Sequence, residues 1–172
     1  MKYLSKALAA CLIVTLFFET TAFAIDSKAT GYKGGTVTGF DGAKDEVEGL
    51  LDMSKQDQLI FTATDNPFKG KTFSITYSKI VDLEYGQKAG RRVGTAVATT
   101  VLFGPIGLLS LLSKKRKHYL TVGFKDDMEK DQVVVLELGK DIVRTTIPII
   151  ETRSGKKVEY QDEESRKSAK GN

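Results

Sequence analysis

The chain has 172 residues, of which 41% are hydrophobic and 28% are charged, a composition that fits one globular domain with short appendages. Lysine and arginine outnumber aspartate and glutamate by 26 to 22, so the net charge is only +4, and we expect no nucleic-acid partner. The single cysteine and single histidine exclude a disulfide framework, multi-cysteine metal sites and two-histidine metal motifs. We therefore expect no metal, no cofactor and no enzymatic activity.

Residues 1–24 have the parts of a secretory signal peptide. Lys2 and Lys6 form a basic start, residues 7–18 are a nearly uninterrupted apolar run, and residues 22–24 read Ala-Phe-Ala, which is typical of a cleavage site. Cleavage there would place the mature protein in the periplasm or cell envelope. Residues 8–11 also spell a bacterial lipobox, in which Cys11 would be lipidated, although the apolar run before Cys11 is short. Lipidation and an uncleaved anchor are the two alternatives.

The first part of the mature chain changes from glycine-rich to strand-like. Residues 25–45 contain five glycines and predict a flexible lead-in with one short strand at 36–40. Residues 47–53 and 58–63 then predict two strands joined by a polar turn.

Strict alternation marks the next strand, over residues 72–78. Phe73, Ile75 and Tyr77 share one face and hydroxyl side chains line the other, which predicts a half-buried strand. Residues 80–85 continue extended, with an apolar face made of Val81, Leu83 and Tyr85.

Two further strands and one helix are predicted towards the C-terminus. Residues 118–125 and 132–138 flank an acidic turn and predict an antiparallel hairpin, the second strand being central and covered on both faces. In residues 141–153 an apolar face recurs at helical spacing, Asp141 can cap the start and Gly155 suits the end, so we expect a helix kinked at Pro148. The charged residues 158–172 predict a disordered tail.

Residues 93–112 are the most unusual feature, because these twenty residues carry no charge. One helix of this length would span roughly 30 Å, enough to cross a bilayer. A central turn signal instead predicts a helical hairpin inserted over residues 91–113, with the turn at Gly104, Pro105 and Gly107. A spanning helix with a basic stop-transfer flank is the alternative.

Basic residues flank this apolar segment on both sides, and a hairpin would bring the two flanks to the same anionic membrane surface. The predicted surface-binding residues are Arg91, Arg92, Lys114, Lys115, Arg116, Lys117 and His118. Gly90, Gly94 and Ala98 form a stripe of small residues that allows close helix packing, either within the hairpin or between copies of the chain.

The order of these elements resembles that of bacterial pleckstrin-homology-like (PH-like) domains. The likeness is carried by the strands at residues 72–86, 118–125 and 132–138 and by the closing segment 141–153, and it spans residues 46–157. It implies a mainly β fold: an antiparallel bent sheet in a partly open barrel, with one C-terminal helix at the open end. It also implies a scaffold for binding rather than for a reaction.

Together these features predict a non-enzymatic exported binding or scaffold module, held at a membrane face by an apolar hairpin and its basic flanks. Its partner would be an anionic lipid surface or a membrane protein. The alternative is a homo-oligomerising or complex-docking membrane protein in which residues 93–112 form one transmembrane or assembly helix.

Overall fold

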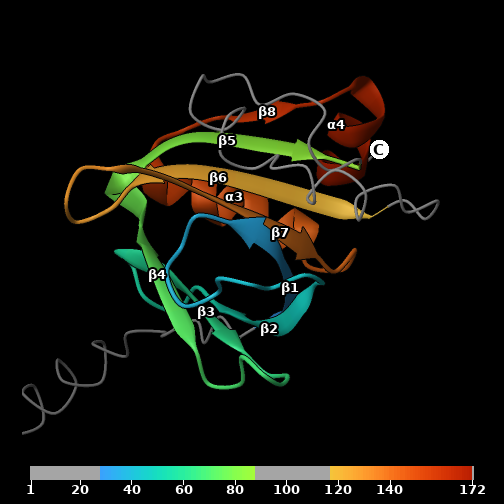
Figure 1. Cartoon of the computed structure of the whole chain (residues 1–172). Coiled ribbons are helices and arrows are strands. Elements are labelled where there is room, and N and C mark those ends of the chain that lie inside the picture. Colours follow the sequence, from blue (N-terminus) through green and yellow to red (C-terminus); the bar gives the residue numbers. More distant parts are fainter. Residues whose placement is uncertain (1–27, 88–116, 172) are drawn as a thin grey trace, which may run out of the picture.

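The computed structural model describes residues 28–87 and 117–171, which form one curled sheet and two α-helices (Figure 1). In chain order the elements are β1 (Lys28–Gly35), β2 (Val47–Asp52), β3 (Gln58–Ala63), β4 (Thr72–Thr76), the 3-10 turn η1 (Tyr77–Lys79), β5 (Ile80–Gly86), β6 (His118–Lys125), β7 (Asp131–Leu138), α3 (Val143–Ser154), β8 (Val158–Tyr160) and α4 (Glu163–Lys170).

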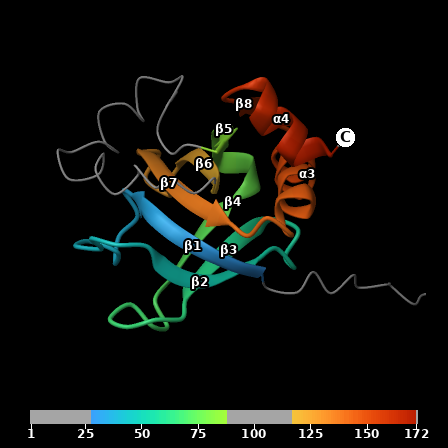
Figure 2. The ribbon, with the colours of Figure 1, turned by 90° about the vertical axis from the view of Figure 1, so that its right-hand side faces the viewer.

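The eight strands make a single mixed sheet in the order β4-β3-β2-β1-β7-β6-β5-β8. Every neighbouring pair is antiparallel except β5 and β8, which run parallel, so the expected purely antiparallel sheet is corrected at this edge. The sheet curls into a half-barrel around α3 (Figures 1 and 2). The concave side holds the core, in which α3 contributes Val143, Ile147 and Ile150.

The predicted helix is confirmed as α3. Its end is the one the sequence indicates, because Gly155 adopts the left-handed conformation with φ 70°. Its beginning differs, since Ile142 is the capping residue and no side chain, including that of Asp141, caps the helix. Burial of one apolar face against the sheet outweighs the cost of Pro148 inside the helix.

Residues 28–35, expected within the flexible lead-in, instead form the central strand β1. This strand pairs with β2 on one side and with β7 on the other. Its backbone groups are therefore hydrogen-bonded on both sides, which stabilises the strand despite its glycines. A side chain at Gly35 would clash with the backbone of Val133, which explains a glycine there. Tyr32 adds a buried ring to the core.

Two of the expected strands are shorter or more irregular than their apolar pattern. The strand at 72–78 ends at Thr76, and Tyr77 begins η1 but remains buried. In β5 the register with β6 shifts between Ile80 and Asp82, which leaves Val81 44% exposed while Leu83 and Tyr85 are buried. The expected shared face of these three residues is therefore wrong for Val81. The hairpin of β6 and β7 is confirmed, and both strands are buried on both faces.

The C-terminal residues also differ from the expected disordered tail. Val158–Tyr160 extends the sheet beside β5, and Glu163–Lys170 forms α4. Asp162 caps α4 by accepting a hydrogen bond from the Ser165 amide at 2.7 Å. Ser165 and Ala169 are buried, so this short helix packs on the domain, and the fold has two helices after β7 rather than one.

Candidate functional site

The apolar segment leaves and re-enters the domain at one end of the sheet. Strands β5 and β6 are antiparallel partners, with Gly86 paired to Tyr119, so Gln87 and Lys117 lie at the same end. His118 in turn pairs with Leu138, the last residue of β7. We call this end, defined by Gly86, Lys117, His118 and Leu138, the insertion end. The ribbon shows α4 beside it (Figure 1).

Lys117 is held in a cluster of charged residues on the outer face of the insertion end. Its Nζ lies 2.7 Å from Glu137 on β7 and 3.3 Å from Glu46, which precedes β2. Glu46 also pairs with Lys33 on β1 at 3.2 Å. The two lysines and two glutamates balance in charge, and only 29% of the Lys117 side chain is exposed.

The two glutamates differ in protonation behaviour. Burial raises the pKa of Glu137, and the neighbouring Glu46 carboxylate acts in the same direction against the opposing charge of Lys117. Burial acts on Glu46 too, but the hydrogen bond and charge of Lys33 outweigh it, so the pKa of Glu46 is lowered. Burial, followed by the charge of Glu137, raises the pKa of the adjacent Tyr119 to about 12. The charge of Lys117 is therefore shared between Glu137 on β7 and Glu46 before β2.

On the inner face of the insertion end lies a buried aromatic pair. Tyr85 Oη is 2.5 Å from His118 Nδ1, and the rings stack with centroids 6.1 Å apart. The same hydroxyl reaches Ser168 on α4 at 3.5 Å. Tyr160 on β8 packs edge-on against Tyr85. These contacts join β5, β6, β8 and α4 at one point.

His118 is not the partly exposed, basic residue that the sequence predicts. It is 9% exposed, and burial followed by the nearby positive charge of Lys140 lowers its pKa. Its imidazole is therefore neutral near pH 7, and its Nδ1 is occupied by Tyr85. Lys117 is likewise engaged in ion pairs, so neither residue belongs to a free anion-binding surface.

The other predicted site residues lie outside the described residues. These are Arg91, Arg92, Lys114, Lys115 and Arg116 of the basic flanks, Gly104, Pro105 and Gly107 of the turn, and Gly90, Gly94 and Ala98 of the stripe. The structure does place the two attachment points of that segment next to each other.

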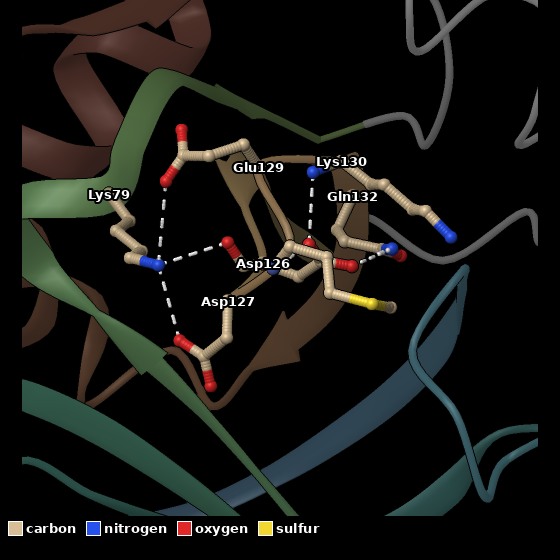
Figure 3. Close-up of polar contacts among 7 residues, drawn as sticks. Lys79, Asp126, Asp127, Glu129, Lys130 and Gln132 are labelled. Carbon is tan, nitrogen blue, oxygen red and sulfur yellow. Dashed lines mark hydrogen bonds and ion pairs between the residues drawn. The ribbon is translucent and has the colours of Figure 1, made fainter.

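A second charged cluster, at the opposite end of β6, is a turn rather than a binding site (Figure 3). Asp126 accepts hydrogen bonds from the amides of Met128 and Lys130 at 2.8 and 2.9 Å and from the Gln132 amide group. Lys79 donates to the Asp126 carbonyl and pairs with Asp127 and Glu129. These carboxylates are occupied in holding the β6–β7 hairpin, where Glu129 has a positive φ of 58°.

Residues 28–87 and 117–171 lack two further features. No helix in that part of the chain is long and apolar enough to cross a membrane. No group of three or more histidine, cysteine, aspartate or glutamate side chains there is placed to hold a metal ion.

Sequence reasoning missed the partners that engage the flank residues. Glu46 and Glu137 are far apart in the chain, and only the pairing of β1 with both β2 and β7 brings them to Lys117. Tyr85 and His118 could have been found, because antiparallel strands joined through the apolar segment must place their inner-face residues side by side. Ser168 carried no signal, since the tail was expected to be disordered.

Comparison with known proteins supports the fold alone. No protein-family model matches the chain, and no curated protein matches it. Among solved structures it is similar to the hSac2 domain from the human phosphoinositide phosphatase Sac2, with a TM-score of 0.51 and 11% sequence identity over 91% of this chain and 90% of that one. At 11% identity this likeness bears on the fold and carries no activity.

Proposed function

We propose that this protein is a non-enzymatic, exported, PH-like scaffold module that is held at a membrane face by residues 93–112 and their basic flanks. The signal-like residues 1–24 support export. The half-barrel closed by α3 supports the PH-like architecture.

The observation that carries the proposal is the pairing of Gly86 with Tyr119. Paired residues in antiparallel strands lie about 5 Å apart, so the chain leaves the sheet before residue 88 and re-enters it after residue 116 at almost the same place. A hairpin with its turn near Pro105 meets this requirement and brings both basic flanks to one side of a membrane. Apolar insertion and attraction to anionic lipid then add in free energy.

A single spanning helix fits the sheet poorly. It would place residues 28–87 and 117–171 on opposite sides of a bilayer about 30 Å thick. Yet β1, which precedes the segment, pairs with β7, which follows it, over five residue pairs. The same sheet cannot form from halves that a membrane separates, so the hairpin is the better proposal.

The decisive experiment replaces residues 91–113 with a short glycine-serine linker. We expect the variant to keep its urea midpoint and the slow amide exchange of β5 and β6, because these strands remain paired, while its helical circular dichroism signal should decrease. We expect the unaltered chain to float with phosphatidylglycerol vesicles and the variant to stop doing so. Retained flotation with an intact fold would contradict the proposal.

A charge series separates the flanks from the sheet. Replacing Arg91, Arg92, Lys114, Lys115 and Arg116 with glutamine should weaken vesicle binding by about 1 kcal/mol for each charge near the surface. Lys117→Gln is the matched control, because its charge is already engaged by Glu46 and Glu137. That control should lower the free energy of unfolding and leave vesicle binding nearly unchanged.

A further inference from the structure

A cleft with an excess of positive charge opens next to the insertion end, between the β7–α3 connection and α4. It has a volume of about 410 Å³ and is lined by Lys140, Asp141, Arg144 and Ser168. Lys140 and Asp141 follow β7, Arg144 is in the first turn of α3, and Ser168 is on α4. The cleft therefore joins three elements that meet only in the folded chain.

Its two cationic side chains are available to a ligand. Among the described residues, neither Lys140 nor Arg144 has a hydrogen-bond or ion-pair partner. The Arg144 guanidinium lies beside Gly171, where an added Cβ would sit 3.2 Å from Cζ, so it is placed at the end of α4. Two cations against the single carboxylate of Asp141 leave the cleft net positive. The uncapped start of α3 adds to this positive potential.

The cleft floor is connected to the buried aromatic pair. Ser168 reaches Tyr85 Oη, which in turn contacts His118 Nδ1. Tyr85 from β5 contacts His118 directly and the charge of Lys140 acts on it, while Tyr160 from β8 and Ser168 from α4 contact Tyr85. An anion beside Lys140 would offset the positive charge that now disfavours the imidazolium. Its binding should therefore raise the pKa of His118, the single histidine in the sequence.

We infer that this cleft binds a negatively charged phosphate group through Lys140, Arg144 and the Ser168 hydroxyl. A guanidinium and an ammonium are the side chains that best bind phosphate oxygens, and a hydroxyl supplies a further donor. The phosphate belongs either to a lipid headgroup at the membrane face or to a free anion. Only the lipid source rests on the proposed membrane function, because the cleft lies beside the point where residues 88–116 attach.

The full chain is kept in a phosphate-free buffer with a non-ionic detergent, and the imidazole signals of His118 are followed by NMR. Inorganic phosphate should shift these signals saturably and raise the pKa of His118. In the Lys140→Gln, Arg144→Gln double variant the affinity should fall at least about tenfold, because two charge-assisted contacts to the phosphate oxygens are lost. Both side chains are exposed, so the fold should be retained.

The matched control is Lys156→Gln, Lys157→Gln, which removes the same charge from the connection between α3 and β8. These exposed residues precede Val158, which pairs with Leu83, and therefore lie away from the insertion end. This variant should bind phosphate like the unaltered chain. Equal loss in both double variants, or no saturable shift of His118 in any of them, would overturn the inference.

Vesicles distinguish the two sources of phosphate. If the lipid is the ligand, the Lys140→Gln, Arg144→Gln variant should bind phosphatidylglycerol vesicles more weakly than the control, and phosphatidylcholine vesicles equally. If only free phosphate binds, the two variants will bind vesicles alike. The variant lacking residues 91–113 keeps the cleft, so it should still titrate with phosphate even if the proposed membrane function is wrong.

Discussion

At the residue scale, the alternation in β4 determines which side chains the core accepts. Ile75 is fully buried, Ser74 is exposed, and Phe73 is only partly buried at the open side of the half-barrel. Phe73 stacks on Phe61 and contacts the rings of Tyr32 and Phe40 edge-on. A cluster of aromatic side chains therefore lines this side of the core. The strand is therefore half-buried, as its pattern indicates.

Ile75→Asp should unfold the domain, because the aspartate would place an unpaired charge in the core at a cost of about 4 kcal/mol or more. Ser74→Asp, the neighbouring exposed position, should cost about 1 kcal/mol or less. Urea denaturation followed by circular dichroism measures both. Equal loss of stability would mean that the outer side of β4 is also covered.

The second residue-scale prediction concerns the pH dependence of stability at His118. Its pKa is lowered in the folded state, first by burial and then by Lys140, so as the pH falls through about 6.5 the unfolded chain takes up a proton that the folded chain does not. The contribution of His118 to the free energy of unfolding is thus complete above that pH and is lost below it.

His118→Asn keeps a hydrogen-bonding group near the Nδ1 position and removes the titration. Between about pH 7.5 and about pH 5.5, the free energy of unfolding should fall more for the unaltered chain than for the variant. The difference should be at most about 1.4 kcal/mol, because each pH unit below the unfolded-state pKa of about 6.5 changes the free energy by that amount. Urea midpoints at the two pH values measure the difference. Identical pH slopes would mean that His118 titrates alike in both states.

At the scale of elements, the sequence correctly predicted the strands whose local apolar pattern agrees with their place in the sheet. Strand β3 has the predicted bounds, and the hairpin of β6 and β7 has the predicted pairing, because an alternating pattern and a polar turn determine both locally. Strand β1 was missed because its glycines lower the intrinsic preference for a strand, while its pairing with both β2 and β7 comes from parts of the chain far away in sequence.

Tertiary contacts also explain the elements at the C-terminus. Arg153 donates to the carbonyl of Lys55 at 2.8 Å and lies over the Tyr77 ring, so it fixes the end of α3 to the β2–β3 turn. No local sequence pattern predicts that contact. Helix α4 is short and charged, and its stability depends on two buried small side chains and on a cap. The candidate site was hidden for the same reason, since Ser168 lies on this helix.

Asp162→Ala tests whether the cap maintains α4. Removing the side chain leaves the Ser165 amide without its acceptor and should destabilise the helix by about 1 kcal/mol. Hydrogen exchange of the α4 amides should accelerate about fivefold, while the amides of β6 and β7 should be unaffected if the helix opens locally. Glu159→Ala, at an exposed position on β8, is the control and should leave exchange in α4 unchanged.

At the scale of the whole molecule, the sheet connects the two described parts of the chain. Strands β1–β5 precede the apolar segment and β6–β8 follow it, yet β1 lies between β2 and β7, and β5 lies between β6 and β8. The core likewise mixes residues from both parts, such as Leu51 and Ile150. A domain built in this way must fold on one side of any membrane that its apolar segment enters.

This topology predicts the outcome of cysteine labelling after the chain binds preformed vesicles. With Cys11 replaced by serine, single cysteines at the exposed positions Ser74 and Lys156, one from each part of the chain, should both react with a membrane-impermeant maleimide added outside. Ile75→Cys, at a fully buried position, is the control and should react only after unfolding. Protection of one exposed cysteine until detergent opens the vesicles would show a spanning segment. It would also contradict the pairing of β1 with β7, because one sheet cannot extend across a bilayer core of about 30 Å.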